Sequence, residues 1–421
     1  MKGIFLIVDG VADEGNVSLD WKTPLEAAKT PNLDEIAKKG RVDYCYPVKE
    51  GVIPQSSSAI ISLFGYEPNE VSRGVLEAMG AGIELKRGDL ALRCNFATIE
   101  NIESLNLLDR RAGRTLTNKE ARILAKAINE QVKLPFKFEF RSTNQHRGVL
   151  IFRGGFSDNI SNIDPHYGIG VVRENNAGNV SFSKPLDDEE DSRLSAELVN
   201  NFVRKSHDVL KGHTLNFGRA SKGLYIANFL LCRDAGNRKP AFKKLKGKWM
   251  ALGYMPLGIG IARALKMDVF RFNYPKMKSI DVYENLNVGL KKSIRYTIKM
   301  IKKFKNKYDY FYVHIKETDV PGLDNKPFEK VKMIELLDRR LFSYLRSVVE
   351  KQKVKLVIAS DHVTSSKRKK YVSGSVPVLF FDPENTRMNE HRFTEEDALK
   401  GRKISGRKLL ERTLFLSRKT I

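Results

Sequence analysis

The sequence predicts an α/β fold with a doubly wound, mostly parallel sheet and a smaller inserted α+β domain. Three short runs, at 3–8, 308–315 and 355–359, are rich in β-branched or aromatic residues, which is typical of strands buried on both faces. Segments with apolar residues at helical spacing precede the second and the third run. Strand and helix therefore alternate along the chain, and this alternation favours a parallel sheet.

The helix before the second strand is expected over 288–307. Its apolar residues recur at helical spacing, while lysines occupy the remaining faces; the apolar residues are Leu290, Ile294, Ile298, Ile301 and Phe304. This pattern is typical of a helix that packs on one side and is solvated on the other. A second helix is expected over 332–351, directly before the third strand.

The middle of the chain has a different pattern of apolar and polar residues. Short alternating runs at 91–97, 136–141 and 149–153 are broken by Gly, Asn and Asp, which favours an α+β domain inserted into the first. We place this inserted domain at 88–239, so that 1–87 and 240–421 form the main domain. The acidic segment 187–191 is either a helix start or a loop.

The composition is strongly basic. The 421 residues include 74 Lys and Arg against 50 Asp and Glu, so the formal charge is 74 − 50 = +24. With 41% hydrophobic residues, disorder is a poor explanation of this charge. Charge by itself supports only solubility and non-specific binding, so we expect a Lys-rich solvated surface. A basic nucleic-acid-binding protein is the non-enzyme alternative, although no aromatic-interleaved RNA-binding signature accompanies the lysines.

The cysteines and the first residues bear on the compartment. Cys45, Cys94 and Cys232 are widely spaced and form no CxxC pair, which argues against a disulfide framework or a thiolate zinc site. The apolar run at 4–8 is too short for a secretion signal or a membrane span. We therefore expect a cytoplasmic protein with no membrane partner.

Acidic residues follow all three predicted strands. Asp9 follows the first, Asp319 the second, and Asp361 with His362 the third. A single acid after a strand is usually a helix cap or a loop residue. Because ligands of doubly wound sheets bind beyond the carboxyl ends of the strands, three acids and a histidine at one edge favour a divalent cation instead.

A serine cluster precedes a short apolar stretch. Gln55, Ser56, Ser57 and Ser58 come directly before the run at 59–64, which can form a buried helix. Hydroxyls at a helix start are most often N-caps. The functional alternative is a nucleophilic serine at a helix N-terminus, activated by the metal of the acidic cluster.

Cationic side chains gather among turn residues of the inserted domain. The cationic residues are Arg110, Arg111, Arg114, His146 and Arg147, and Asp109 directly precedes the first of them. Arginine suits the bidentate recognition of phosphate or carboxylate. Ordinary ion pairing at the surface is an equally good interpretation of these residues.

Motifs along nearly the whole chain resemble a known family. TPNLDEIAKKG at 30–40 resembles a signature of the alkaline phosphatase superfamily. Longer matches resemble the archaeal-type cofactor-independent phosphoglycerate mutases; they are VDGVAD at 8–13, SLFGY at 62–66, RGVLEAMGAGIELKRGDLALRCNFAT at 73–98, DRRAGR at 109–114, SDNISNIDPH at 157–166, HIKETD at 314–319 and SDH at 360–362.

The resemblance implies a two-domain enzyme with an alkaline phosphatase-like fold and a dinuclear site, usually of Mn or Mg. Such enzymes interconvert 3-phosphoglycerate and 2-phosphoglycerate through a phosphoserine. The family's first metal site falls on Asp9, Ser56, Asp361 and His362, and Ser56 takes the place of the nucleophile.

The second metal site of the family matches only in part. Its aspartate falls on Asp319, but its two histidines fall on Leu323 and Tyr371. Leucine cannot bind a metal, and tyrosine does so only as phenolate. Three further family positions near the metals are replaced, by Ser57, Ile60 and Ile259. We therefore expect one intact metal site and a degenerate second site.

Several functions stay open on this basis. The chain is a mutase that works slowly or with a cation in place of the lost metal, for which Lys367 to Lys370 are candidates. Alternatively, it is a catalytically lapsed or one-metal paralogue that still binds phosphate esters. A phosphatase of the same superfamily is the third possibility, since water can take the phosphoryl group from the serine.

Overall fold

The structure is a computed structural model that describes residues 1–421 except 69, 168–179, 277–278, 280, 387 and 416–421. The chain forms two compact units. The first unit comprises Met1–Pro68, Lys243–Tyr254 and Leu265–Ile421, and the second comprises Asn69–Phe242 and Met255–Ala264. These divisions differ from the sequence-based boundaries at 88 and 239.

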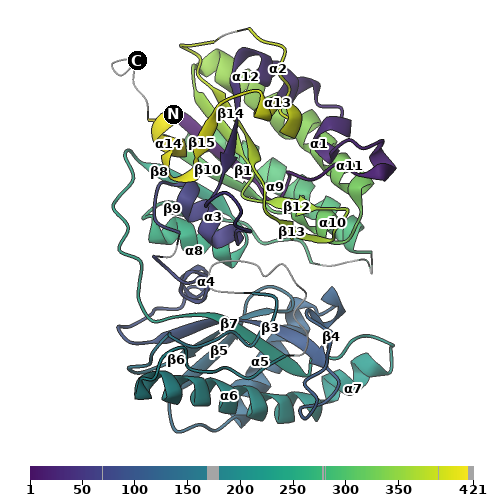
Figure 1. Ribbon diagram of the computed structural model, residues 1–421, viewed down its shortest axis with the longest axis vertical. Helices are drawn as coiled ribbons and strands as arrows, with labels where there is room; N and C mark the ends of the chain where they lie inside the picture. Colours follow the sequence, from purple (N-terminus) through teal and green to yellow (C-terminus); the bar gives the residue numbers. More distant parts are fainter. Residues whose placement is uncertain (69, 168–179, 277–278, 280, 387, 416–421) are drawn as a thin grey trace. The chain divides into compact units, whose positions relative to one another are not determined.

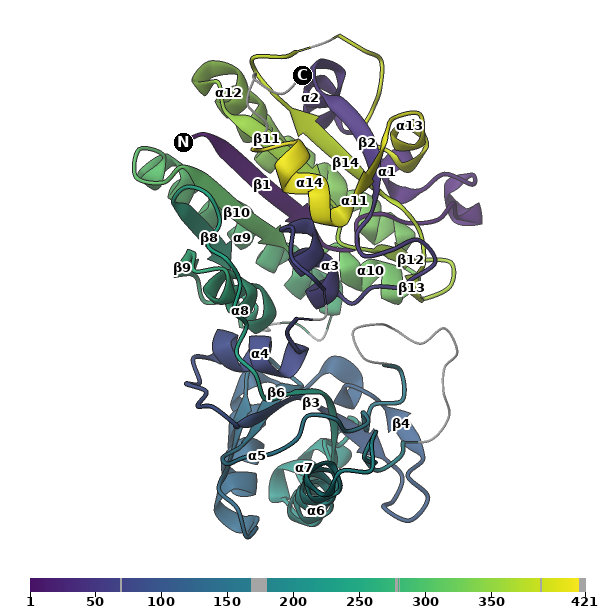
Figure 2. The ribbon, with the colours of Figure 1, turned by 60° about the vertical axis from the view of Figure 1, so that its left-hand side comes forward.

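The first unit is built on an eight-stranded sheet (Figures 1 and 2). Its strands are β1 (Gly3–Val8), β2 (Arg41–Tyr46), β8 (Trp249–Gly253), β9 (Asp268–Arg271), β10 (Tyr310–Ile315), β11 (Lys355–Ala359), β14 (Val376–Phe381) and β15 (Lys403–Ser405). They lie in the order β15-β2-β14-β11-β1-β10-β8-β9. The pairings of β14 with β11 and with β2 are antiparallel, and the other pairings are parallel. The predicted mostly parallel sheet is confirmed.

The central strand of this sheet is β1. It lies between β10 and β11, is parallel to both, and is buried along its whole length. The first and third predicted strands coincide with β1 and β11, while β10 begins at Tyr310 rather than at 308. Because parallel strands end at the same edge of a sheet, the residues that follow these three strands come together.

Helices cover both faces of this sheet. They are α1 (Pro24–Ala27), α2 (Pro31–Lys39), α3 (Ser56–Leu63), α9 (Val282–Phe304), α10 (Asp319–Leu323), α11 (Pro327–Leu337), α12 (Ser343–Gln352), α13 (Glu395–Leu399) and α14 (Leu409–Arg412). Ile4 and Leu6 share a core with apolar residues of α9, α11 and α12. On the other face, Phe5 meets Phe64 with ring centroids 5.1 Å apart. Figure 2 shows α3 and α14 in front of the sheet and α11 behind it.

Both predicted helices are present. The first is longer than expected and forms α9, with Leu290, Ile294 and Ile301 buried and lysines exposed between them. The second spans α11 and α12, which are joined by the π-helical turn Asp338–Phe342. The periodicity of apolar residues was therefore a sound guide to the helices of this unit.

The second unit has a separate antiparallel sheet. Its elements are α4 (Arg73–Ala81), β3 (Leu90–Ile99), β4 (Leu107–Asp109), α5 (Asn118–Gln131), β5 (Phe138–Ser142), β6 (Arg147–Phe152), α6 (Glu190–Lys211), α7 (Thr214–Ala220), β7 (Phe229–Gly236) and α8 (Pro256–Ala264). The strand β3 pairs with β4, β6 and β7, and β5 pairs with β6. Apolar residues of α5 and α6 join those of the strands in one core. The acidic segment 187–191 leads into α6, so it is a helix start.

Close helix packing places α4 and α8 in the second unit. The two helices cross so tightly that a Cβ atom on Gly260 would lie 1.8 Å from the carbonyl oxygen of Leu76. In addition, α4 contacts β3, β6 and β7 of the antiparallel sheet. Sequence patterns do not reveal such a crossing, because its partners are almost 200 residues apart.

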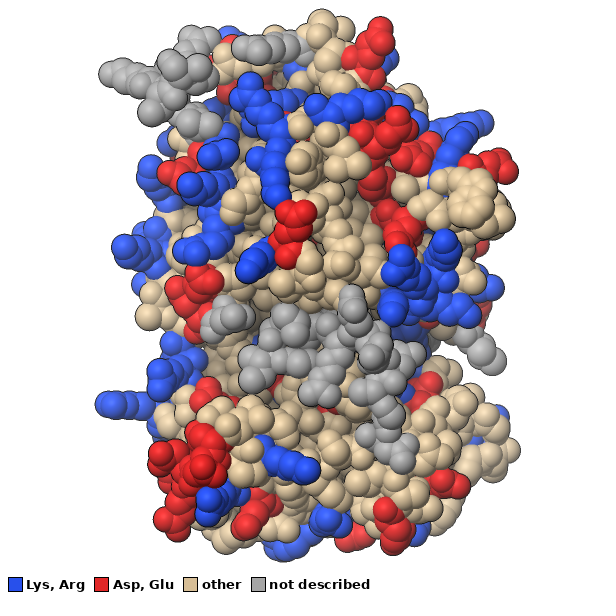
Figure 3. All heavy atoms as spheres, in the orientation of Figure 1, with Lys and Arg blue, Asp and Glu red and all other residues tan. Residues whose placement is uncertain are grey.

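The surface is basic without one continuous basic stripe on the face seen in Figure 3, where Lys and Arg alternate with Asp and Glu. No described helix is long and apolar enough to cross a membrane. Cys94 and Cys232 are free thiols on β3 and β7, directly opposite each other, with Sγ atoms 3.0 Å apart. Strand pairing brings together these two cysteines, which the sequence spacing separates.

Candidate functional site

The turn after β1 places Asp9 at the carboxyl edge of the sheet. Gly10 has a φ of +54°, and its N–H donates to Asp361 Oδ1 at 3.0 Å. A Cβ atom on Gly10 would lie 2.3 Å from Thr364 Oγ1. Thr318 Oγ1 donates to the carbonyl oxygen of Asp9 at 2.6 Å. Segments that follow β1, β10 and β11 are therefore bonded to one another around Asp9, as predicted from the strand ends.

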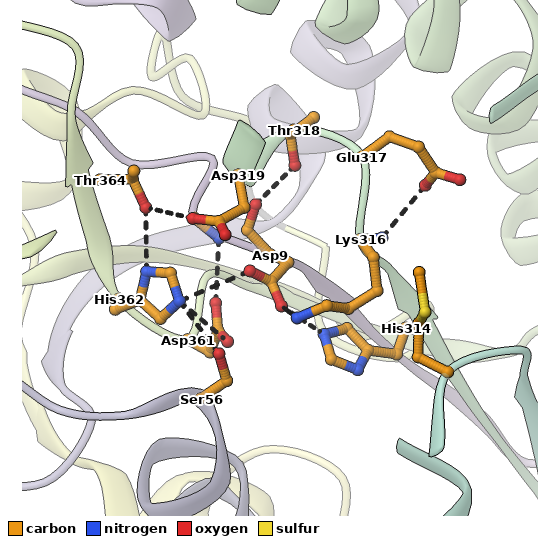
Figure 4. A network of polar contacts seen from close by, with 12 residues as sticks. Asp9, Ser56, His314, Lys316, Glu317, Thr318, Asp319, Asp361, His362 and Thr364 are labelled. Carbon is orange, nitrogen blue, oxygen red and sulfur yellow. Dashed lines mark hydrogen bonds and ion pairs between the residues drawn. The ribbon is translucent and has the colours of Figure 1, made fainter. Parts of the chain in front are cut away.

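Each oxygen of the Asp9 carboxylate has a different environment (Figure 4). Oδ2 lies 2.9 Å from His314 Nε2 and accepts a hydrogen bond from Lys316 Nζ. Oδ1 has no hydrogen-bond partner among the described residues, and neither has Oδ2 of Asp361. His362 Nε2 lies 3.4 Å from each of these two oxygens. Two buried carboxylates thus converge on one imidazole.

The Ser56 hydroxyl joins this group from α3. Its Oγ lies 3.2 Å from His362 Nε2. The N-cap of α3 is Gln55, and Ser56 is the first helical residue. The more common N-cap interpretation is therefore wrong for Ser56, whose hydroxyl faces the acidic cluster instead.

The other nitrogen of His362 leads to Asp319. Thr364 Oγ1 lies 3.0 Å from His362 Nδ1 and donates to Asp319 Oδ1 at 2.8 Å. Asp319 Oδ2 accepts a hydrogen bond from the Tyr371 hydroxyl at 3.0 Å. Both oxygens of the Asp319 carboxylate are therefore bonded to hydroxyl groups. Leu323, at the end of α10, offers no ligand atom.

Burial and charge shift the pKa values of the cluster in opposite directions. Burial raises the pKa of Asp9, but Lys316, His314 and His362 together lower it well below its usual value. Burial and the neighbouring Asp9 raise the pKa of Asp361. Burial lowers the pKa of His362, but Asp361 and Asp9 outweigh it and raise that pKa to about 9. The cluster therefore stabilises positive charge between the two carboxylates.

Two sets of side chains have the spacing of metal ligands. Asp9, His314 and Asp361 form one set, and Asp9, Asp319 and His362 form the other. Within each set the ligand atoms lie within 4.8 Å of one another. Carboxylate oxygens suit Mn and Mg, and imidazole nitrogen suits several transition metals.

In the second unit, Asp109 shapes the turn that carries the arginines. Its Oδ1 accepts hydrogen bonds from the N–H groups of Arg111 and Gly113, both at 2.7 Å. Ala112, Gly113 and Arg114 all have positive φ angles, of 47°, 66° and 58°. Such backbone strain clusters at functional sites.

Arg110 belongs to a separate buried group of the same unit. Its guanidinium donates to both oxygens of Asp164, at 3.1 and 2.9 Å. The Tyr167 ring lies 5.1 Å from Arg110 and 3.6 Å from Arg233, measured from each guanidinium carbon to the ring centroid. Burial raises the pKa of Asp164, but Arg110 and Arg233 lower it on balance.

The remaining cations surround His146. This histidine is buried, and burial together with Arg147, Arg111, Arg93 and Arg114 lowers its pKa well below the usual value. The structure therefore brings Arg111, Arg114, His146 and Arg147 together, as the sequence suggested. A concentration of guanidinium groups around a neutral histidine favours the binding of an anion.

Comparison with known proteins decides the family. The family described as 2,3-bisphosphoglycerate-independent phosphoglycerate mutase matches residues 37–216. A relative of that name from Thermococcus gammatolerans is 35% identical over 406 residues, which cover 95% of this chain and 93% of the relative. The chain belongs to the 2,3-bisphosphoglycerate-independent phosphoglycerate mutase family.

Other known proteins are similar to this chain over nearly its whole length. The mutase of Aeropyrum pernix is 33% identical over 437 residues, and the match covers 99% of each chain. A solved Pyrococcus horikoshii structure has a TM-score of 0.74 at 28% identity and covers 100% of this chain and 99% of its own. The cofactor-independent phosphoglycerate mutase from Thermoplasma acidophilum has a TM-score of 0.57 at 27% identity, with coverage of 99% and 100%.

Sequence reasoning missed several residues that lie beside the candidate ones. In the first unit these are His314, Lys316 and Thr364, and in the second Arg93 and Arg233. The sequence does hold a signal for His314 and Lys316. They are two residues apart at the end of a strand, so their side chains lie on the same face of the sheet. Arg93 and Arg233 lie within strands, where a lone arginine has no such signal.

Proposed function

We propose that this chain interconverts 3-phosphoglycerate and 2-phosphoglycerate through a phosphoserine at Ser56. The observation that carries the proposal is the Ser56 hydroxyl in the first turn of α3, 3.2 Å from His362 Nε2 and beside the carboxylates of Asp9 and Asp361. The mutases that match nearly the whole chain support the same reaction.

A divalent cation, Mn or Mg, fits the residues that the family resemblance assigns to the first metal. Asp9, Ser56, Asp361 and His362 would hold it. Oδ1 of Asp9 and Oδ2 of Asp361 are buried without hydrogen bonds from the described residues. Burying such an oxygen costs free energy, which coordination of a cation would offset. A bound cation would lower the pKa of a coordinated hydroxyl and so make it a better nucleophile.

The residues of the chain account for two phosphoryl transfers. In the first, the bond from Ser56 Oγ to phosphorus forms as the bond to the 3-oxygen of the glycerate breaks, and the serine proton ends on that oxygen. In the second, the 2-hydroxyl oxygen takes the phosphoryl group and its proton returns to Ser56. The N-terminus of α3 favours the negative charge that develops on Ser56.

The second unit supplies groups that can hold the glycerate while the serine carries the phosphoryl group. The residues proposed for this are Asp109, Arg110, Arg111, Arg114, His146 and Arg147. Asp109 organises the turn, and the guanidinium groups pair with carboxylate or phosphate. Because the pKa of His146 is lowered, its imidazole is neutral at pH 7 and can accept or donate a hydrogen bond.

We also infer that the second metal site of the family is degenerate here. Both oxygens of Asp319 already accept hydrogen bonds, from Thr364 and Tyr371. Leu323 has no donor atom. These residues do not fit a second divalent cation, so we assign no step to one. The hydrogen bonds that occupy both Asp319 oxygens also favour a second candidate function, that of a one-metal paralogue that binds phosphate esters without turning them over.

An enolase-coupled assay with 3-phosphoglycerate tests the mutase directly across added Mn²⁺, Mg²⁺, Zn²⁺ and Co²⁺. We expect activity that Ser56→Ala abolishes. Ser58→Ala is the matched control, because the Ser58 hydroxyl donates to the Gln55 carbonyl in the same helix. A flat trace with every metal would refute the mutase and favour the binding paralogue. Release of free phosphate in place of 2-phosphoglycerate would identify a phosphatase.

Elemental analysis of the purified protein tests the degenerate site. We expect one metal per chain, and the double change Leu323→His with Tyr371→His should raise the occupancy towards two. Two equivalents in the unmodified protein would contradict the inference. No gain in the double variant would place the defect at another replaced position, such as Ser57 or Ile259, which are both buried.

A further inference from the structure

The loss of a second dication leaves the site short of positive charge, and Lys316 is placed to supply it. Lys316 follows β10, and only 17% of its side chain is exposed. Asp9 is the one acceptor that the described part of the chain offers to its ammonium. Since an ammonium has three N–H donors, two remain for a ligand.

The backbone of Lys316 is held from two sides. Its N–H donates to the Tyr254 hydroxyl and to Glu317 Oε2, both at 3.1 Å. Buried Glu317 in turn accepts hydrogen bonds from the hydroxyls of Tyr254 at 2.6 Å and Tyr274 at 3.1 Å. On the other side, Thr318 is bonded to the Asp9 carbonyl. These contacts fix the loop, so the ammonium needs little reorganisation to meet a ligand.

The charge count favours the same residue. Asp9, Asp319 and Asp361 contribute −3, and a single dication together with Lys316 contributes +3. The site is then neutral before a phosphoryl group arrives, with His362 counted as neutral when it binds the metal. The exposed basic run considered from the sequence is a weaker candidate, because Lys367 lies on the surface over the ring of Trp21, 5.7 Å from its centroid.

We propose that Lys316 supplies positive charge that a single metal does not: its ammonium holds Asp9 and donates hydrogen bonds to the phosphoryl oxygens during transfer. This proposal rests on the proposed function, since it assumes a phosphate ester at Ser56. No covalent bond to Lys316 forms at any stage, and the phosphoryl transfers to and from Ser56 are unchanged.

The test compares Lys316→Met and Lys316→Arg with Lys299→Met, a matched loss of one exposed lysine on α9. Three measurements are made on each variant. The coupled assay gives kcat and KM, and calorimetry gives the Kd of Mn²⁺ and the Kd of inorganic phosphate for the Mn²⁺-loaded protein.

For Lys316→Met we expect kcat to fall about 100- to 1000-fold and phosphate to bind at least about tenfold more weakly. The Kd of Mn²⁺ should not rise, because a competing positive charge is removed. Lys316→Arg should keep most of the phosphate affinity, and Lys299→Met should match the unmodified protein.

The outcomes separate this proposal from the mutase itself. Phosphate affinity within about threefold of the unmodified protein in Lys316→Met would overturn the role of Lys316 even if mutase activity is present. An inactive unmodified protein whose phosphate binding still depends on Lys316 would refute the mutase and support the lysine. A protein that neither turns over substrate nor binds phosphate would overturn both. If Lys316→Met fails to fold, as judged by its thermal unfolding, Lys316→Gln takes its place.

Discussion

Replacement of Lys330 by methionine is expected to damage both the stability of the first unit and its acidic cluster. Lys330, on α11, is fully buried, as is the Asp13 carboxylate that it meets at 2.8 Å. Its ammonium also donates to the carbonyl oxygens of Ala12 at 3.3 Å and Thr364 at 3.1 Å. All three donors are therefore used, and they join the segment after β1 to the segment that carries His362.

The magnitude follows from what the substitution leaves behind. Methionine has a similar length but no charge, so Asp13 stays buried as an uncompensated carboxylate and two carbonyl oxygens lose a donor. Removing one partner of a buried ion pair costs roughly 3–5 kcal/mol. Ser366 still donates to Asp13 from its N–H and its hydroxyl, which places the expectation at the lower end, at about 3 kcal/mol.

Urea unfolding followed by circular dichroism measures this loss, and calorimetry measures the Kd of Mn²⁺. We expect a Kd about tenfold higher, because the Thr364 side chain contacts His362 and Asp319. Lys332→Met is the matched control, since that side chain is 65% exposed and its ion-pair partner among the described residues is Glu329. Its effect should stay within about 0.5 kcal/mol. Adding Asp13→Asn should recover more than half of the loss in Lys330→Met. A loss under about 1 kcal/mol, or a double variant no better than the single one, would refute the reasoning.

Three further outcomes are expected. Burial raises the pKa of Glu395 to about 7. As pH rises from about 4.5 to 7, the free energy of unfolding of the unmodified protein should therefore fall by up to about 3 kcal/mol relative to that of Glu395→Gln. Urea unfolding of both proteins at several pH values measures this difference, and parallel curves would contradict it. Gly260→Ala should unfold at a markedly lower temperature and cost about 2 kcal/mol or more, because its Cβ would meet the Leu76 carbonyl oxygen; an unchanged midpoint would refute the tight crossing. Burial raises the pKa of Tyr167, but Arg233 and Arg110 outweigh it and lower that pKa to about 7. The change Tyr167→Phe should therefore remove a step in tyrosinate absorbance near pH 7. An absorbance titration identical to that of the unmodified protein would argue against this.

The first unit was largely predictable from local sequence. Buried strands carry continuous β-branched runs, and parallel strands end at one edge. The sequence alone therefore places Asp9, Asp319, Asp361 and His362 together. Ser56 was harder, because a hydroxyl at a helix start is usually a cap. Its position inside α3, after the N-cap Gln55, and its contact with His362 separate the two interpretations.

The boundaries of the second unit were less predictable. The segments around Gly260 and Leu76 pair helix against helix, and nothing in the local sequence indicates which helices cross. The same holds for Cys94 and Cys232, which strand pairing places opposite each other. Contacts between distant segments depend on topology, whereas propensity and periodicity report only on near neighbours.

The sequence by itself determined the α/β class, the acids at the strand ends, the serine cluster and the replacement of two expected histidines by Leu323 and Tyr371. Those features depend on residue type and order, which the chain states directly. Only the tertiary structure decided that Tyr371 bonds to Asp319 and that Lys316 bonds to Asp9. Each of these contacts joins side chains from different strands or loops, and their distance and direction are fixed by how the sheet and its connections pack.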